Sequence, residues 1–299
     1  MDMRTLSVPG LAVATALAAA SLAPVPAGAT TPVYLAAVLD GANEVPVKGT
    51  KAGDQDGSAI AVFRVHGHRV EYAVRWHKIA APSGFHIHRG QAGENGEVKI
   101  PFFGQALPAT LHAVKGAVTV KDRALLGRIL NNPGNWYANV HNKKFAAGAA
   151  RAQLHRIRPV ALESVLSHGF TTTLTTRADG RQEVPAAGTK VGDRDGRAGW
   201  LVQPQGGRVW FAAAWERIGA PVGAHLHRAP KGKNGPVAVP FLAAKKGLPA
   251  GVNGVAGSAA VSAALARRIW NNPGNWYANL HTAQFPGGAI RGQLYRGDW

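Results

Sequence analysis

Hydrophobic and polar positions alternate along short stretches of the chain, which is the pattern of half-buried β-strands. Residues 58–65 and 69–76 are two such stretches, separated by three residues with a central glycine. Asp56-Gly57 and Asn95-Gly96 mark tight turns, because glycine accepts the positive φ that these turns require. Helical spacing is confined to two short segments, 123–130 and 263–270. The pattern predicts an all-β fold of antiparallel strands, a sandwich or a barrel.

The sequence contains an internal repeat, in which the same motifs occur twice in the same order. Glu44-Val45-Pro46 recurs as Glu183-Val184-Pro185, a shift of 139 residues. Two longer motifs recur at a shift of 139 or 140: His86-Ile87-His88-Arg89 as His225-Leu226-His227-Arg228, and residues 131–139 unchanged as 271–279. A period near 140 residues indicates a duplicated domain. We expect a first domain over 30–158, a linker over 159–167 and a second domain over 168–299.

The N-terminal 29 residues have the features of a secretory signal peptide. Residues 11–23 are apolar but too short to span a bilayer, and Ala27-Gly28-Ala29 resembles a cleavage site. Residues 1–29 are therefore predicted to be removed, which makes the protein secreted or associated with the cell envelope. A retained anchor is the alternative, because Asp2 offsets the charge of Arg4. No transmembrane segment is expected in the mature chain.

Composition excludes several kinds of site. The chain has no cysteine, which removes disulfides, thiolate-bound metals and thiol nucleophiles. Its formal charge of +18 is divided evenly, with 17 basic and 8 acidic residues over 30–160 and 16 and 7 over 161–299. Such a surface attracts anionic partners such as cell-wall polymers, although charge also serves solubility alone. No nucleic-acid-binding motif accompanies the charge, so specific nucleic-acid recognition is not expected.

Three of the histidine positions occur in both copies. They pair as His86 with His225, His88 with His227, and His141 with His281. Residues i and i+2 of a strand point to one face, so each His-x-His pair presents two imidazoles together. If its strand lies beside that pair, the third histidine completes a site of three nitrogens, which suits copper or zinc better than calcium or magnesium. The alternative is a structural cluster of hydrogen-bonded imidazoles.

Arg151 and its counterpart Arg291 permit two interpretations. On the histidine face they could guide an anion toward a bound metal. Otherwise they would form a structural bridge to a carboxylate such as Glu44.

Other motifs are weaker. Asp54-Gln55-Asp56-Gly57 resembles the start of a calcium loop but lacks the glutamate at the twelfth position, so a hairpin turn is predicted. The repeated tryptophans could stack on sugars, although packing in or beside the core is favoured: Trp76, Trp136, Trp215 and Trp276. Motifs of serine hydrolases, kinases, zinc proteases and dinucleotide-binding enzymes are absent.

The order of these motifs resembles the CHRD domain, a family named from chordin and common in exported microbial proteins. The motifs are Gly41-x-x-Glu44-Val45-Pro46, His86-Ile87-His88-x-Gly90, Tyr137-x-Asn139-x-His141 and Gly148-x-x-Arg151-x-Gln153-Leu154, each with a second copy. The resemblance implies tandem immunoglobulin-like β-sandwich or barrel domains, and it implies no agreed activity. Departures lie near the histidines, at Ala146–Ala150 and at Ala229-Pro230.

A weaker similarity is to the copper half of copper–zinc superoxide dismutases. It rests on a His-x-His pair, a later histidine and a glycine-flanked arginine. By analogy, a copper ion on the three histidines could cycle superoxide while Arg151 or Arg291 attracts it. The bridging histidine, the zinc ligands and the cysteines of that family have no counterparts here.

The favoured interpretation is a non-catalytic extracellular binding or structural module. The alternatives are a copper or zinc protein with one three-histidine site per domain, and adhesion to anionic wall polymers.

Overall fold

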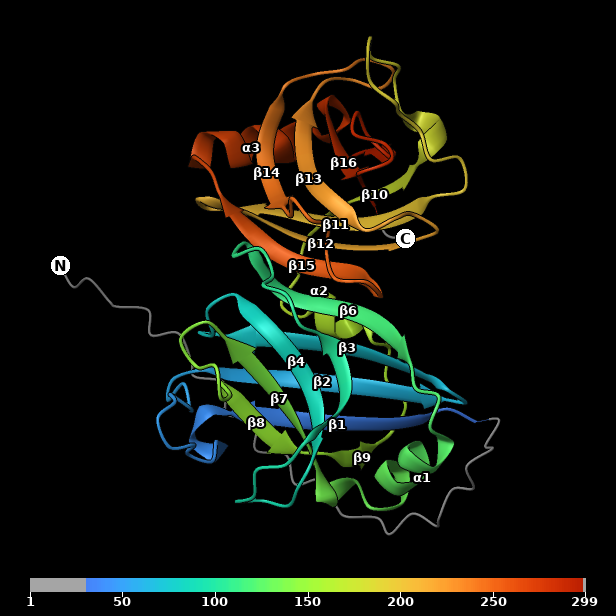
Figure 1. The fold of residues 1–299 in the computed structure, drawn as a ribbon. Helices are drawn as coiled ribbons and strands as arrows, with labels where there is room; N and C mark the ends of the chain where they lie inside the picture. The colour runs from blue at the N-terminus through green and yellow to red at the C-terminus, as the bar shows by residue number, and fades with distance from the viewer. Residues whose placement is uncertain (1–30, 298–299) are drawn as a thin grey trace, which may run out of the picture.

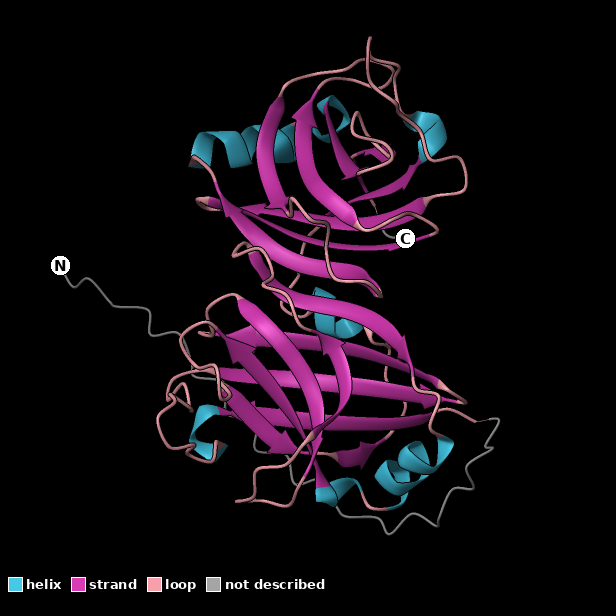
Figure 2. Cartoon of the chain, viewed as in Figure 1, coloured by secondary structure: helices cyan, strands magenta, loops and turns pink. Residues whose placement is uncertain are grey.

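The computed structural model describes residues 31–297 and is built almost entirely of antiparallel strands (Figures 1 and 2). The strands of the first half are β1 (Val33–Asp40), β2 (Ser58–His66), β3 (Arg69–His77), β4 (Pro82–Arg89), β5 (Val98–Phe103), β6 (Leu111–Thr119), β7 (Trp136–Asn142), β8 (Ala150–Gln153) and β9 (His155–Ile157). The strands of the second half are β10 (Leu174–Asp179), β11 (Arg197–Gln205), β12 (Arg208–Glu216), β13 (Pro221–Arg228), β14 (Val237–Ala243), β15 (Val252–Ala260), β16 (Trp276–Thr282), β17 (Ile290–Gln293) and β18 (Tyr295–Arg296).

Helices are short, and one of the α-helices lies between the two halves (Figure 2). The α-helices are α1 (Arg123–Asn131), α2 (Glu163–Ser167) and α3 (Ala263–Asn271), and single 3₁₀ turns cover Gly41–Asn43, Pro133–Asn135, Gly180–Gln182 and Pro273–Asn275. The two helices predicted from spacing are α1 and α3. Each is capped by a side chain that accepts a backbone N–H of its first turn: Asp122 from Leu125 and Ser262 from Leu265. None of the helices in residues 31–297 has the length and apolar character needed to cross a bilayer.

The core of each half lies between two layers of strands. In the first half, Phe63 of β2 and Tyr72 of β3 meet Phe85 of β4 and Phe102 of β5, with the Tyr72 and Phe102 ring centroids 4.6 Å apart. The second half repeats this packing with Trp200, Phe211 and Phe241. Each fully buried aromatic contributes about 1.5–3 kcal/mol. This packing fixes the layer that contains β4 and β7, on which the histidines lie.

The two halves share one continuous sheet. β6 of the first half pairs with β15 of the second, in a register that sets Val114 opposite Val255. The backbones approach closely there, since a Cβ on Gly257 would lie 2.2 Å from the carbonyl oxygen of Thr110. The prediction of antiparallel all-β structure is confirmed, but the strands do not divide into two separate sheets per domain. Without this pairing, β6 and β15 would each be an edge strand of its own half. The pairing gives each strand a hydrogen-bonded neighbour, so its backbone N–H and C=O groups are not left exposed. The alternation of residues within one half does not predict this contact.

The segment predicted to be a linker is packed against both halves, since Leu166 clusters with Ala113 of the first half and with Ala212 and Ala256 of the second. It contains α2, whose residues Val165 and Leu166 are buried. Arg75 of β3 donates a hydrogen bond to the carbonyl of Leu166 at 3.3 Å, and Lys115 of β6 pairs with Glu163 at 2.7 Å. The predicted signal peptide, residues 1–29, lies outside the described residues.

Candidate metal centre

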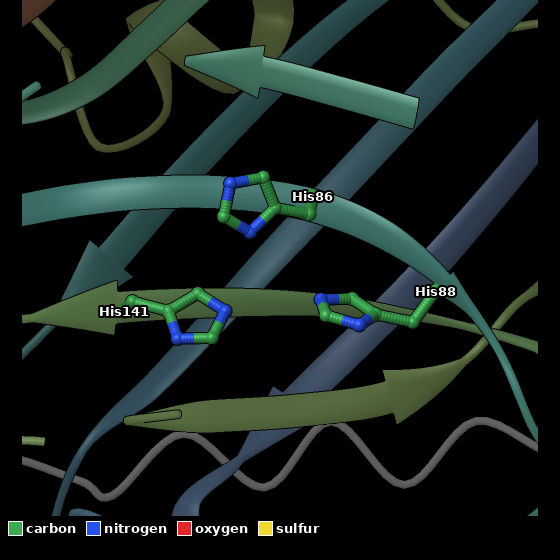
Figure 3. A group of neighbouring side chains, drawn as sticks. All are labelled: His86, His88 and His141. Carbon is green, nitrogen blue, oxygen red and sulfur yellow. The ribbon is translucent and has the colours of Figure 1, made fainter. Parts of the chain in front are cut away.

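Local strand geometry positions the first two histidines of each triad. His86 and His88 project from one face of β4, while Ile87 between them points into the core and is 1% exposed. β7 pairs with β4 in a register that sets Asn139 opposite His86 and His141 opposite Gly84. His141 therefore lies diagonally across from His86, and the three imidazoles point toward one another (Figure 3).

Both triads are close enough for one ion. One ring nitrogen from each of His86, His88 and His141 lies within 4.8 Å of the others, and the same holds for His225, His227 and His281. Ligand nitrogens about 2.0–2.1 Å from a common tetrahedral ion lie about 3.4 Å apart, so a bound ion would draw the three rings slightly closer together. The structure thus brings together all six histidines that recur in both copies, and the remaining histidines belong to neither triad.

Hydrogen bonds to carbonyl oxygens determine which nitrogen faces the centre. His88 Nδ1 lies 3.0 Å from the carbonyl oxygen of Gly96, and His141 Nδ1 lies 3.1 Å from that of Ala146. A carbonyl only accepts, so each Nδ1 carries the proton and each Nε2 keeps a lone pair. These Nε2 atoms, together with Nδ1 of His86, are buried without a hydrogen-bond partner. Three buried nitrogens that face one another without hydrogen-bond partners fit a shared metal ion.

The second triad uses the same arrangement. His227 Nδ1 and His281 Nδ1 lie 2.9 Å from the carbonyl oxygens of Gly235 and Pro286. His225 Nδ1 lies 3.1 Å from His281 Nε2. Since His281 Nε2 is an acceptor, His225 Nδ1 donates to it without metal, and a metal ion would replace that single proton.

The triads are held in the neutral form that binds metal. Burial, followed by the proximity of His141 and His88, lowers the pKa of His86 to about 4. Burial, followed by the proximity of His281 and His227, lowers that of His225 to about 4. The pKa values of the other four histidines are also lowered, chiefly by burial. Neutral imidazoles can ligate without first releasing a proton to solvent.

A glycine makes room for the first imidazole of each triad. A Cβ on Gly84 would lie 3.0 Å from Cε1 of His86, and a Cβ on Gly223 would lie 3.4 Å from Cε1 of His225. Sequence reasoning overlooked this pair, although the glycine two residues before the first histidine recurs in both copies.

A tyrosine and an arginine stack behind the second histidine. The Tyr137 ring lies parallel to His88, with centroids 4.8 Å and planes 10° apart, and the Arg151 guanidinium lies 3.4 Å from its other face. The Tyr137 hydroxyl accepts the N–H of Gly96, whose carbonyl holds His88. The stack thus fixes the orientation of the His88 ring.

Arg151 and Arg291 are buried structural groups, 1% and 2% exposed. Arg151 donates to the carbonyls of Gln91 and Glu94 and to the side chain of Asn95, which ties the loop after β4 to the sheet. Arg291 makes the equivalent bonds in the second half. These hydrogen bonds go to loop carbonyls and an asparagine side chain rather than to the predicted carboxylate partner, and the role of the two arginines as anion guides stays a prediction.

A carboxyl group lies on the far side of Asn139. Glu44 accepts a hydrogen bond from Asn139 at 3.5 Å, and Glu183 accepts one from Asn279 at 2.6 Å. Burial raises the pKa of Glu44 to about 7 against the opposing effect of Arg151, and that of Glu183 to about 8. Neither carboxyl belongs to a triad.

The remaining candidate motifs have structural places. Gly57 closes a tight turn by donating to the carbonyl of Asp54 at 2.8 Å, so the predicted turn is confirmed, but it lies at the end of the long loop from β1 to β2 and is not a tight hairpin. The four repeated tryptophans are buried, as expected for packing in the core: Trp76, Trp136, Trp215 and Trp276.

Comparison with known proteins agrees with this duplicated arrangement. The CHRD domain family model matches residues 35–154 and again residues 174–294. No curated protein and no solved structure matched the chain. The two matches cover most of its length and include all six triad histidines, so the chain belongs to the CHRD domain family, of which it carries two copies.

Proposed function

We propose that this protein binds one transition-metal ion in each half, through His86, His88 and His141 in the first and His225, His227 and His281 in the second. The proposal rests on three buried imidazole nitrogens of the first triad that face one another. Two of them, Nε2 of His88 and Nε2 of His141, must carry a lone pair, because the Nδ1 of each ring donates its proton to a backbone carbonyl. Three imidazoles without thiolate or carboxylate suit copper or zinc.

The favoured role is binding without catalysis, as a module of the cell exterior. In this proposal each half is an immunoglobulin-like unit. The two layers of strands around its aromatic core support that assignment. Export is supported by the sequence of residues 1–29.

A redox role is the second candidate, because His86 and His141 are only partly buried and three ligands leave a coordination position open. A bound copper ion would supply one-electron chemistry at that position. The protein itself would hold the imidazoles neutral and oriented through the carbonyls of Gly96 and Ala146. Superoxide is the reactant to assay first, since the donor set resembles that of superoxide dismutases.

Metal titration tests the proposal. We expect close to two copper or zinc ions per chain, one ion in His86→Ala, and none above background in His86→Ala/His225→Ala. His77→Ala, an exposed histidine at the end of β3, is the matched control and should retain two. Unchanged stoichiometry in the double variant would refute the assignment. Binding should weaken as pH falls, because protonated imidazole cannot ligate.

A further inference from the structure

A cavity of about 400 Å³ opens in the second half, away from both triads. It lies between the segment before β10, the end of β11 and helix α3. The residues that give it chemical character are Thr171, Gln203, Gln205, Ala266, Arg267 and Trp270. Its volume is within the range of small-ligand sites, about 300–1,000 Å³.

Several residues that line this cavity differ between the two copies. The positions of Ala266 and Trp270 in α3 correspond to Leu126 and Leu130 in α1, and both leucines are buried in the core. Alanine at 266 vacates the volume that a leucine side chain would fill. Trp270 is only partly buried and lines the space, and the exposed Arg267 replaces Gly127 of the first copy.

The polar groups of the cavity are oriented. The side-chain oxygen of Gln203, a buried residue, accepts the N–H of Thr171 at 2.9 Å, and its amide donates to the Gln205 oxygen at 3.0 Å. Arg296, which is not among the lining residues, has its guanidinium 5.0 Å from the Trp270 ring centroid and donates a hydrogen bond to the Trp270 carbonyl, which helps to hold the indole in place. An aromatic wall, two hydrogen-bonded carboxamides and Arg267 therefore line one concave site.

These groups fit a sugar acid. The apolar C–H face of a pyranose ring packs on an indole, hydroxyls pair with carboxamides, and a carboxylate pairs with guanidinium. The chain's charge of +18 raises the local concentration of polyanions. We infer that this cavity binds one uronate residue of an acidic polysaccharide, independently of the metal proposed for the triads.

Calorimetric titration of the full chain with tetragalacturonate tests the inference. Ala266→Leu installs the first-copy residue and fills the cavity, and Trp270→Leu removes its aromatic wall. Each should weaken binding at least tenfold. Arg267→Gln should also weaken it about tenfold, whereas Arg268→Gln, the same charge change at an exposed neighbour outside the cavity, should leave it within about twofold. Thermal melts establish that each variant folds.

Three results would overturn the inference. The first is an unchanged affinity in Ala266→Leu together with equal losses of affinity in Arg267→Gln and Arg268→Gln. That result would show that binding depends on general charge attraction and not on the cavity. The second is equal binding of neutral maltotetraose. The third is binding of a single-stranded oligonucleotide with the same dependence on Ala266→Leu. Tetragalacturonate binding should be unchanged in His86→Ala/His225→Ala, so failure here and failure of the metal proposal are distinguishable.

Discussion

The two halves agree closely at the histidine triads and differ at the helix beside the core. The Tyr–His stack has centroid separations of 4.8 and 4.7 Å, and the Arg–Tyr distance is 3.4 Å in both halves. By contrast, Leu126 and Leu130 of α1 are replaced by Ala266 and Trp270 in α3. The three histidines of a triad meet only when the two strands that carry them pair in one register. A change in that pairing would therefore move all three imidazoles. A helix at the edge of a half can exchange side chains locally, and in the second half the exchanged residues Ala266 and Trp270 line a cavity.

Among variants that would make the two halves differ at their triads, we expect the largest effect from Arg151→Ala or Arg291→Ala. Each removes a buried guanidinium and leaves two loop carbonyls and an asparagine oxygen without their donors. We expect a loss of about 2–4 kcal/mol in the free energy of unfolding for either variant, measured by urea denaturation. Metal affinity should fall only in the half that carries the change. A loss below about 0.5 kcal/mol would show that the guanidinium is not structural.

A smaller effect should separate the two triads. Gly84→Ala places a Cβ 3.0 Å from the His86 ring, whereas Gly223→Ala leaves 3.4 Å to the His225 ring. We expect about tenfold weaker metal binding at the first site and at most about threefold at the second, because only the closer imidazole must move. Site-resolved titration in the His225→Ala and His86→Ala backgrounds gives the two values. The reverse order would show that ring displacement does not control affinity.

The smallest effect concerns pH and the buried carboxyls. The folded pKa of Glu44 is about 7 and that of Glu183 about 8, both above the ordinary value of 4.5. The folded state therefore holds the proton more tightly, and this stabilisation is lost as pH rises through 7 for Glu44 and through 8 for Glu183. Glu183→Gln and Glu44→Gln should each remove part of the loss, by an amount on the order of 1 kcal/mol, with Glu183→Gln the larger. The loss extends from the ordinary pKa of 4.5 up to these folded values, so thermal melts between pH 4.5 and pH 9 measure both, and identical pH slopes in variants and wild type would contradict the assignment.

Much of the site was predictable from the duplication. Recurrence selected His86, His88 and His141 with their counterparts, and the i, i+2 rule placed the first two on one face. The same rule set Tyr137, Asn139 and His141 on one face of β7, which the structure confirms through the β4 register. The Tyr137–Arg151 stack was not predicted, because it depends on the order of β4, β7 and β8.

Sequence alone determined the duplication, the all-β character, two short helices and the histidine pairs, because these follow from repetition or from the spacing of residues a few positions apart. Tertiary structure decided the pairing of β6 with β15, the burial of Arg151, and the nitrogen that each imidazole presents. Those features join residues from about 8 to about 140 positions apart. Their geometry is set by strand order and by the packing of the whole core. The hydrophobic periodicity of a short segment does not reveal either of these.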